Sequence, residues 1–211
     1  MAIVTALRTS RGRGKRITIS LNGKFAFSLE AEVAVKEKLK VGQELASDQI
    51  ATLAKSDQFQ RCHNTATTYL SYRPRSEYEM RQRLLGRGFS SDAIEAVLKR
   101  LREQGLVNDI AFAEFWQDNR QLFSPRSQWL VRLELRQKGI SNDVIERVAS
   151  TISDGDNAYR AATSRAHRLP LSDYESFRRC LDKFLKRRGF GYWVIKETIE
   201  LLWQEIGGRQ G

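Results

Sequence analysis

Cysteine and histidine are scarce in this chain, which has only two of each among its 211 residues. Cys62 and Cys180 lie far apart in the sequence and show no metal-ligand spacing, so we expect two small buried residues in a reducing compartment. His63 and His167 have no Cys, Asp or Glu neighbours at the spacing that zinc sites require. The sequence therefore predicts no disulfide scaffold, no metal site and no cofactor.

The patterns of common catalytic sites are missing as well. No Gly-x-x-x-x-Gly-Lys-Ser/Thr loop is present, and LGRGFSS at 85–91 has the character of a turn between two helices. The acidic residues have basic neighbours on amphipathic stretches and form no visible pair of carboxylates. We therefore predict that the protein is not an enzyme and has no catalytic residues.

Long apolar runs are also absent, because no stretch approaches the length of a membrane span. The first residues, MAIVTALRTSRGRGK, lack the continuous apolar region of a secretory signal. We therefore expect a cytoplasmic protein without membrane contact.

Positive charge, by contrast, is abundant. The chain has 36 Lys and Arg residues against 25 Asp and Glu, a formal net charge of +11 and a pI near 9.9. Such a surface attracts polyanions or an acidic face of another protein. Because 41% of the residues are hydrophobic, the chain can also build a core and is expected to fold.

The first 46 residues differ from the remainder by an apolar period of two. Residues 17–21 alternate apolar and polar side chains, and residues 25–29 do so again after Asn22-Gly23. Asn-Gly accepts the positive φ angles of a two-residue turn, so this pattern predicts a β-hairpin. A third strand is expected at 3–7 and a short helix at about 30–39, which completes a small β-rich module.

From Ser47 onward the apolar spacing is helical, and it repeats. Gly88, Gly139 and Gly189 are 51 and 50 residues apart, a period within the range of repeat architectures. Aligning them brings apolar residues three and four apart into register, so each copy contains two amphipathic helices joined by a glycine turn. The aligned sets eight before, four before and six after the glycine are Met80, Val131 and Leu181; Leu84, Leu135 and Leu185; and Ile94, Ile145 and Ile195.

Capping residues mark the helix ends. Each glycine follows basic residues at a helix end, the usual place for a left-handed residue, and Ser90 or Ser141 follows as an N-cap. A third helix fills each period, at about 58–70, 109–120 and 156–168, with Asn108-Asp109 and Asp156 as caps. The predicted fold is mainly α, with a β-rich module at 1–46 and three-helix repeats at 47–107, 108–153 and 154–211.

Two near-copies of one pentapeptide, YRPRS at 72–76 and FSPRS at 123–127, contain two of the three prolines. Proline separates the first helix of a repeat from the second. Ser76 is expected to form a capping box with Glu79, whereas Ser127 lacks that glutamate, and Ser124 is an equally suitable cap.

The chain resembles the RecX family of bacterial RecA regulators in three successive segments, YRPRSEYEMRQRLLGRGFSSDAIEAVLKRLREQGLVND, FAEFWQDNR and SPRSQWLVRLELRQKGIS. The resemblance extends over about 58–205 and is strongest at 69–148. The third repeat departs most, since it lacks the Pro-Arg-Ser segment and has Gly191-Tyr192-Trp193 in place of Ser-x-Asp before its last helix.

This resemblance implies a protein that binds RecA or its nucleoprotein filament and mainly inhibits the recombinase and coprotease activities in DNA repair and the SOS response. It also implies three tandem three-helix repeats in an elongated, curved molecule that lies along the filament groove. We expect a monomer with accompanying nonspecific affinity for single- or double-stranded DNA, which should weaken with salt.

The positive charge is concentrated in the middle helix of each repeat. Residues 73–88, 126–138 and 177–188 carry net charges of +3, +3 and +5, which together equal the formal charge of the chain. An elongated array would present these segments as a stripe. The candidate contacts to RecA or DNA are Arg73, Arg75, Arg81, Arg126, Arg132, Arg136, Lys183, Arg187 and Arg188, and secondary DNA contacts are Arg11, Arg13, Lys15 and Arg16.

Helix-end effects explain some of these cations. Arg87, Lys138 and Arg188 precede a glycine, where a cation stabilises the helix end by about 0.3 to 1 kcal/mol, so a structural role is favoured there. Arg81 and Arg132 leave two explanations open, a partner contact or a solvated face with i to i+4 pairs.

Arg75 and Arg126 have no such explanation in the predicted fold. Each stands near a helix N-terminus, where the dipole disfavours a cation. We therefore predict that the fold does not require them and that they contact the partner.

A direct DNA-binding protein remains the alternative, because a three-helix unit with a tight turn is also the outline of a helix-turn-helix domain. The basic residues favour the RecA regulator, since they lie on the middle helices rather than on the last helix of each unit, which would read the DNA. Asn and Gln are also not concentrated at the start of the last helices, where base contacts are expected.

Overall fold

The computed structural model describes residues 1–9, 16–170 and 173–207, which form a small sheet followed by helices. The chain divides into two compact units, one comprising residues 1–74 and 80–107 and the other residues 75–79 and 108–211. Residues 75–79 thus group with the second unit, although the residues on both sides of them belong to the first.

Four strands form the N-terminal sheet in the order β3-β2-β1-β4, with antiparallel neighbours. They are β1 (Ala2–Thr9), β2 (Arg16–Leu21), β3 (Lys24–Glu30) and β4 (Glu44–Leu45). Asn22 and Gly23 join β2 to β3 with φ angles of 48° and 80°, which confirms the predicted hairpin and its turn. The third strand is confirmed as β1, whereas β4 was missed because two residues are too few to show alternation.

The sheet buries one face against two helices. Val4, Ile19 and Leu29 pack with Val33 of α1 (Ala31–Lys36) and with Leu53 of α2 (Ser47–Tyr72). The predicted short helix is therefore confirmed as α1, with narrower bounds.

The β module and the first repeat share α2, a single helix of 26 residues, so the expected helix start near residue 58 is wrong. No Gly or Pro interrupts residues 47–72, and the helix continues through them. Cys62 and Ala66 in its second half enter the core of the first repeat. Between the two cores, Asp57 accepts a hydrogen bond from the Glu30 backbone N–H at 2.7 Å and pairs with Arg16 at 3.4 Å.

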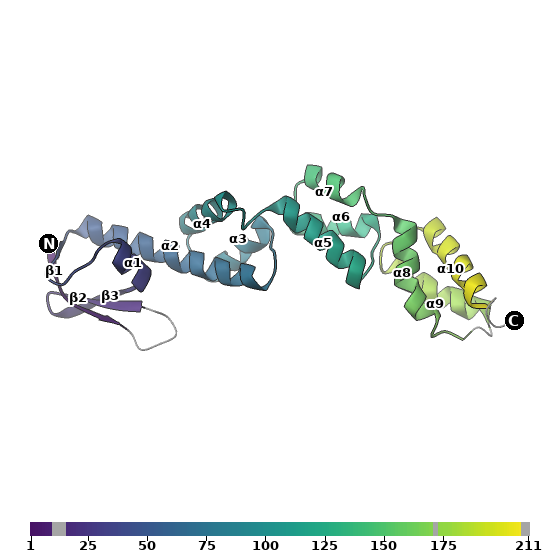
Figure 1. Ribbon diagram of the computed structural model, residues 1–211, viewed down its shortest axis with the longest axis horizontal. Helices are drawn as coiled ribbons and strands as arrows, with labels where there is room; N and C mark the ends of the chain where they lie inside the picture. Colours follow the sequence, from purple (N-terminus) through teal and green to yellow (C-terminus); the bar gives the residue numbers. More distant parts are fainter. Residues whose placement is uncertain (10–15, 171–172, 208–211) are drawn as a thin grey trace. The chain divides into compact units, whose positions relative to one another are not determined.

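Three three-helix repeats are present, as predicted (Figure 1). The first consists of α2, α3 (Glu77–Leu85) and α4 (Ser91–Glu103); the second of α5 (Asp109–Phe123), α6 (Gln128–Gln137) and α7 (Asn142–Ala149); and the third of α8 (Asp154–Ala166), α9 (Tyr174–Lys186) and α10 (Tyr192–Gly207). Each repeat buries its own apolar cluster, and the positions eight before, four before and six after the glycine are buried in all three copies.

The glycine turns are confirmed, with φ angles of 80° at Gly88, 76° at Gly139 and 81° at Gly189. A left-handed residue at this place lets the chain leave one helix and start the next within a few residues. The spacing of the three glycines therefore reports a repeated backbone conformation.

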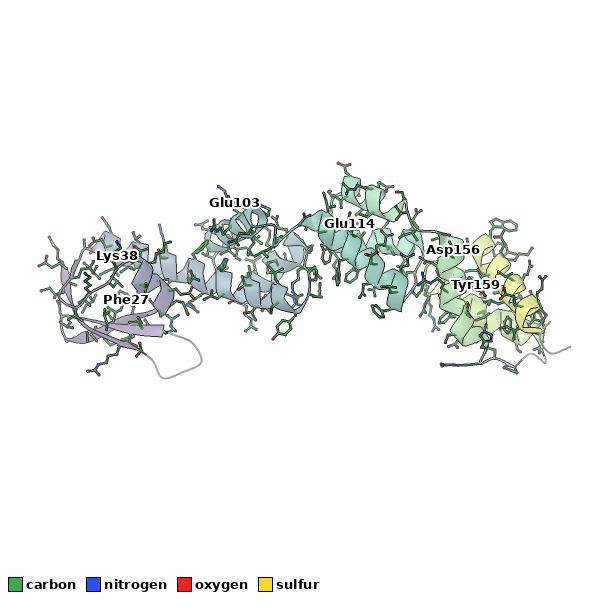
Figure 2. All side chains as sticks on the ribbon, in the orientation of Figure 1. Phe27, Lys38, Glu103, Glu114, Asp156 and Tyr159 are labelled. Atoms are coloured by element: carbon green, nitrogen blue, oxygen red, sulfur yellow. The ribbon has the colours of Figure 1, made fainter. Side chains whose placement is uncertain are left out.

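The predicted helix caps are partly right. The side chains of Ser90 and Asn108 accept hydrogen bonds from backbone N–H groups at the starts of α4 and α5, whereas Ser141 precedes α7 without such a bond. Asp156 is not a cap, because α8 begins at Asp154 and places Asp156 inside the first turn (Figure 2). Ser153 caps this helix, and sequence reasoning missed it because Ser and Asp are about equally good caps.

Candidate partner interface on the helical repeats

Each Pro-Arg-Ser segment forms a junction, which is a set of contacts inside the second unit between this segment and the residues that follow it in the sequence. Ser76 and Ser127 are both fully buried. The Ser76 hydroxyl donates to the carbonyl oxygen of Lys138 at 2.7 Å, and the Ser127 backbone N–H donates to the carbonyl oxygen of Arg188 at 3.0 Å. Since Lys138 and Arg188 each precede the turn glycine of the following repeat, both junctions join the same parts of two neighbouring copies.

Each serine also caps the middle helix of its own repeat. The Ser76 hydroxyl accepts from the Glu79 backbone N–H at 3.1 Å, and the Ser127 hydroxyl accepts from a backbone N–H in the first turn of α6 at 3.2 Å. The half of the predicted capping box that Ser76 supplies is confirmed, whereas the Glu79 carboxylate accepts a hydrogen bond from Lys138. Ser124 is not the cap of α6, because it ends α5.

An aspartate from the next repeat completes each junction. Asp109 Oδ1 accepts from the Glu77 backbone N–H at 2.8 Å, and Asp154 Oδ1 accepts from the Gln128 backbone N–H at 2.6 Å. These N–H groups belong to the first residues of α3 and α6, where a helix leaves its backbone donors without internal partners. The negative charge is also favoured there by the helix dipole.

The turn glycines of the second and third repeats have a further role at these junctions. A Cβ atom on Gly139 would overlap Cβ and Cγ of Tyr78, and one on Gly189 would lie 2.6 Å from Ser127 Oγ. Gly88 has open space at the same place, and no repeat precedes it. Gly139 and Gly189 are thus needed both for their φ angles and for the close approach of the preceding repeat.

The third repeat has no Pro-Arg-Ser segment before its middle helix. Asp173 caps α9 and accepts from the backbone N–H groups of Glu175 and Ser176 at 3.0 and 3.1 Å. Hydrogen bonding with Ser176 and Glu175 lowers the pKa of Asp173. The two copies of the pentapeptide therefore correspond to the two junctions, which sequence reasoning did not recognise.

Arg75 and Arg126 belong to the folded structure, contrary to the sequence-based expectation. Arg75 is buried, with 8% of its surface exposed. Arg126 pairs with Glu134, which also accepts hydrogen bonds from Trp116 Nε1 and Arg120 Nε, both at 2.8 Å. For Arg126 the expectation failed because Glu134, whose negative charge offsets the unfavourable helix dipole there, lies two helical turns further along the chain.

Arg81 and Arg132 occupy matching positions and have matching partners. Arg81 pairs with Glu95, and Arg132 pairs with Glu146 at 2.8 Å, so each joins the middle helix to the last helix of its repeat. The chain has Asp182 and Lys196 at the corresponding positions of the third repeat, with the two signs exchanged.

The cations that precede the glycines are also held by neighbours. Arg87 Nε donates to the Tyr69 hydroxyl at 2.9 Å, and this hydrogen bond raises the pKa of Arg87. Lys138 pairs with Glu79 at 2.5 Å, and Arg188 stacks on the Phe184 ring at 3.9 Å. The structural role favoured for this position is consistent with these contacts.

The remaining candidate cations lie in all three repeats. Arg73 donates to the carbonyl oxygen of Pro74 at 2.8 Å, and Arg136 donates to Asn142 at 3.3 Å. Lys183 and Arg187 on the third repeat are exposed, and the described part of the chain offers them no ion pair. Sequence reasoning named both, but it could not separate them from the paired cations.

Of the secondary candidates, only Arg16 lies within the described residues, and Arg11, Arg13 and Lys15 fall outside them. Arg16 is the first residue of β2 and pairs with Glu30 at 3.0 Å and with Asp57 at 3.4 Å. It therefore ties the β module to α2.

Within residues 1–9, 16–170 and 173–207, no group of three or more His, Cys, Asp or Glu side chains has the arrangement of a metal site. No helix formed by these residues is long and apolar enough to span a membrane. Cys62 is buried, as expected, whereas Cys180 is only half-buried.

Known proteins share this arrangement of repeats. The family model of the first three-helix domain of RecX matches residues 62–101, and that of the second three-helix domain matches residues 108–148. The regulatory protein RecX of Bacillus subtilis is 30% identical over 204 residues, which cover 95% of this chain and 77% of that protein. The chain belongs to the RecX family.

Further RecX proteins are similar to this chain in sequence and in structure. The regulatory protein RecX of Clostridium botulinum is 28% identical over 206 residues, which cover 95% of this chain and 96% of that protein. A crystal structure of a regulatory protein RecX has a TM-score of 0.68 at 26% identity and covers 95% of this chain and all of that chain. RecX from Lactobacillus salivarius has a TM-score of 0.58 at 25% identity, over 70% of this chain and 97% of its own.

These comparisons confirm the family resemblance that the sequence segments indicated. Each of the two matched domains contains one Pro-Arg-Ser segment. The relatives are named regulatory proteins, and none of the names given above describes an enzyme.

Proposed function

We propose that this RecX-family protein binds RecA, free or in its nucleoprotein filament, and inhibits the recombinase and coprotease activities in DNA repair and the SOS response. Membership of the RecX family carries the proposal. The protein acts as a monomer without a cofactor, and a weaker nonspecific affinity for DNA accompanies the main interaction.

The third repeat provides the cations best suited to contact a partner. Arg179, Lys183 and Arg187 are four residues apart on α9 and at its end, so they share one helix face, and all three are exposed. The described residues offer them no ion pair, unlike Arg81, Arg126 and Arg132 in the other repeats. A partner therefore meets these charges without first breaking a contact of the protein.

The first turns of the last helices in the first two repeats weigh against a helix-turn-helix protein that reads bases. The first turns of α4 and α7 contain Asp92 and Asp143, which repel the phosphates of DNA at the place where a reading helix contacts the major groove. In α10 the first turn has no acid but presents Tyr192 and Trp193, which are 64% and 69% exposed.

The proposal is tested with a double charge reversal, Lys183→Glu with Arg187→Glu. We expect on the order of tenfold more of this variant to be needed for half-inhibition of RecA-driven ATP hydrolysis on single-stranded DNA, because exposed interface charges govern association. Lys99→Glu with Arg100→Glu on α4 is the matched control, since both residues are exposed.

Wild-type inhibition is expected at substoichiometric amounts relative to RecA. If inhibition appears only when the protein coats the DNA, direct DNA binding is the function. If the α9 variant inhibits as well as the control, α9 is not the contact surface. Arg75→Glu and Arg126→Glu are unsuitable for this test, because burial of Arg75 and the Arg126–Glu134 pair make both variants probes of folding.

A further inference from the structure

A basic depression of about 500 Å³ lies on the third repeat, between α8 and the C-terminal end of α9. Its lining includes Arg165 and Arg168 at the end of α8, Arg188 just after α9, and the ring of Phe184. None of the described residues that line it is acidic. Three guanidinium groups thus border one hollow without a carboxylate of the chain between them.

The Phe184 ring orients two of these guanidinium groups. The Arg188 guanidinium carbon lies 3.9 Å from the ring centroid, and that of Arg165 lies 5.2 Å from it. An aromatic face attracts a cation but accepts no strong hydrogen bond, so it leaves most of the five N–H donors of each arginine unused. Arg188 Nε is buried and has no hydrogen-bond partner among the described residues.

The charges around Arg188 repel one another. Burial lowers the pKa of Arg188, and the neighbouring cations Arg126, Arg187 and Arg165 lower it further. Arg126 shares Glu134 with Arg120, so its charge is partly neutralised, whereas Arg165 has a hydrogen bond of 3.4 Å to Cys180 Sγ and no ion pair in the described part of the chain. An anion in the depression would relieve this repulsion.

We propose that this depression is a phosphate-binding site, in which Arg165, Arg168 and Arg188 donate hydrogen bonds to one phosphate group and the exposed Ser164 hydroxyl adds a fourth donor. A phosphate carries about −1.5 to −2 charges at neutral pH and three strong acceptor oxygens, whereas a carboxylate carries one charge and two oxygens. Three arginines around one hollow match the phosphate better.

This inference does not depend on RecA. The phosphate group belongs either to a free phosphate compound such as a nucleotide or to a nucleic-acid backbone. A free phosphate has the charge and the three oxygens given above, whereas a backbone diester carries a single charge and two unesterified oxygens, which the same arginines can bind. Lys183 and Arg187, used to test the proposed function, are not among the lining residues. Failure of one proposal therefore leaves the other standing.

The test titrates inorganic pyrophosphate into isotope-labelled protein at constant ionic strength and follows backbone amide resonances. We expect saturable shifts confined to residues 161–169 and 184–188. Arg165→Gln with Arg168→Gln should weaken binding by about tenfold or more, because two charge-assisted hydrogen-bonding groups are lost. Lys99→Gln with Arg100→Gln removes the same charge from exposed positions on α4, outside the depression, and its affinity should change less than about twofold.

Two further arms identify the source of the phosphate and guard against misfolding. A labelled single-stranded oligonucleotide is bound to the protein and then displaced with pyrophosphate. If pyrophosphate displaces it, and if it binds the Arg165/Arg168 variant more weakly than the control, the site binds a nucleic-acid phosphate. If the variant loses pyrophosphate binding but keeps oligonucleotide binding, the site binds a free phosphate compound. If the Gln variant does not fold, Arg165→Lys with Arg168→Lys keeps the charge but loses the bidentate geometry and should also bind more weakly. The absence of saturable shifts at these residues, or equal weakening in the control, overturns the site.

Discussion

Glu134 is the residue on which the cations of the second repeat converge. Only 9% of its surface is exposed, and its carboxylate pairs with Arg126 and Arg120, while Trp116 Nε1 donates to it at 2.8 Å. Arg120 also lies over the Trp116 ring, 4.6 Å from its centroid. Removal of this one acid would leave two arginines and an indole N–H without their shared acceptor.

Glu134→Ala is therefore expected to lower the free energy of unfolding by about 2 to 3 kcal/mol, below the range for fully buried pairs because both arginines are partly exposed. Urea unfolding followed by circular dichroism measures this loss. Glu175→Ala, which removes the exposed pair with Arg178, is the control and should cost much less than Glu134→Ala, because water screens this pair. Equal losses in the two variants would show that Glu134 is not a structural centre.

The two cysteines should differ in reactivity. Burial raises the pKa of the Cys62 thiol to about 11, above the value of about 8.5 for an unfolded cysteine. Cys62 therefore stays protonated in the folded protein, and its contribution to stability is complete below about pH 8.5 and is lost as pH rises toward 11.

Iodoacetamide at about pH 8 should modify the half-buried Cys180 of the native protein while Cys62 reacts only after unfolding in urea. Mass spectrometry of the modified peptides measures both rates. Native Cys62 reacting as fast as the unfolded residue would contradict its burial.

At the scale of secondary structure, each Pro-Arg-Ser segment forms one junction. Each combines a buried serine, an aspartate from the next repeat and a turn glycine in close contact. Because Gly88 lacks such a contact, a substitution at Gly88 tests the effect of the positive φ angle alone.

Gly189→Ala should therefore be more destabilising than Gly88→Ala. Both place alanine at a positive φ, which costs about 1 to 2 kcal/mol, and Gly189→Ala adds the overlap with Ser127 and Leu130. Hydrogen exchange of the Gln128 amide, which donates to Asp154, should accelerate in Gly189→Ala and stay unchanged in Gly88→Ala. Unchanged protection of Gln128 in both variants would show that the junction tolerates a methyl group.

For the whole molecule, the net charge of +11 is a poor guide to where a partner binds. Many cations of the middle helices of the first two repeats are engaged, as Arg81, Arg126, Arg132 and Lys138 have ion pairs within the described structure. On α9 of the third repeat, Arg179, Lys183 and Arg187 are exposed and have no ion pair among the described residues, so part of the positive field available to a partner is expected to originate there.

Binding to the RecA filament should weaken steeply with salt because of this field. Raising sodium chloride from about 50 to about 200 mM should slow association at least about tenfold for the wild type. The slope should be shallower for Lys183→Glu with Arg187→Glu than for Lys99→Glu with Arg100→Glu, as measured by surface-based kinetics. If the association rates of the two variants depend on salt in the same way, the charges that attract the partner lie elsewhere.

Local pattern was sufficient for the elements and their repetition. A sequence directly displays features that depend on backbone conformation and on side chains one to four residues apart. Such features are the alternation at 17–21, the Asn22-Gly23 turn and the glycine turns that recur about every 50 residues. The same short-range features, kept in order, also indicated the family. Less certain were the helix starts, where Ser and Asp compete as caps, as Ser153 and Asp156 show.

The site residues required contacts that no local pattern encodes. Ser76 meets Lys138 across 62 positions, and Arg81 meets Glu95 across 14, so the sequence alone placed the cations without revealing which of them are already paired. Composition and periodicity therefore determined the fold class, the repeat and the excess of positive charge. Only contacts between residues far apart in the sequence decided that Pro-Arg-Ser is a junction. They also decided that Arg126 and Arg132 are paired, whereas Lys183 and Arg187 have no ion pair among the described residues, because pairing depends on distances in space.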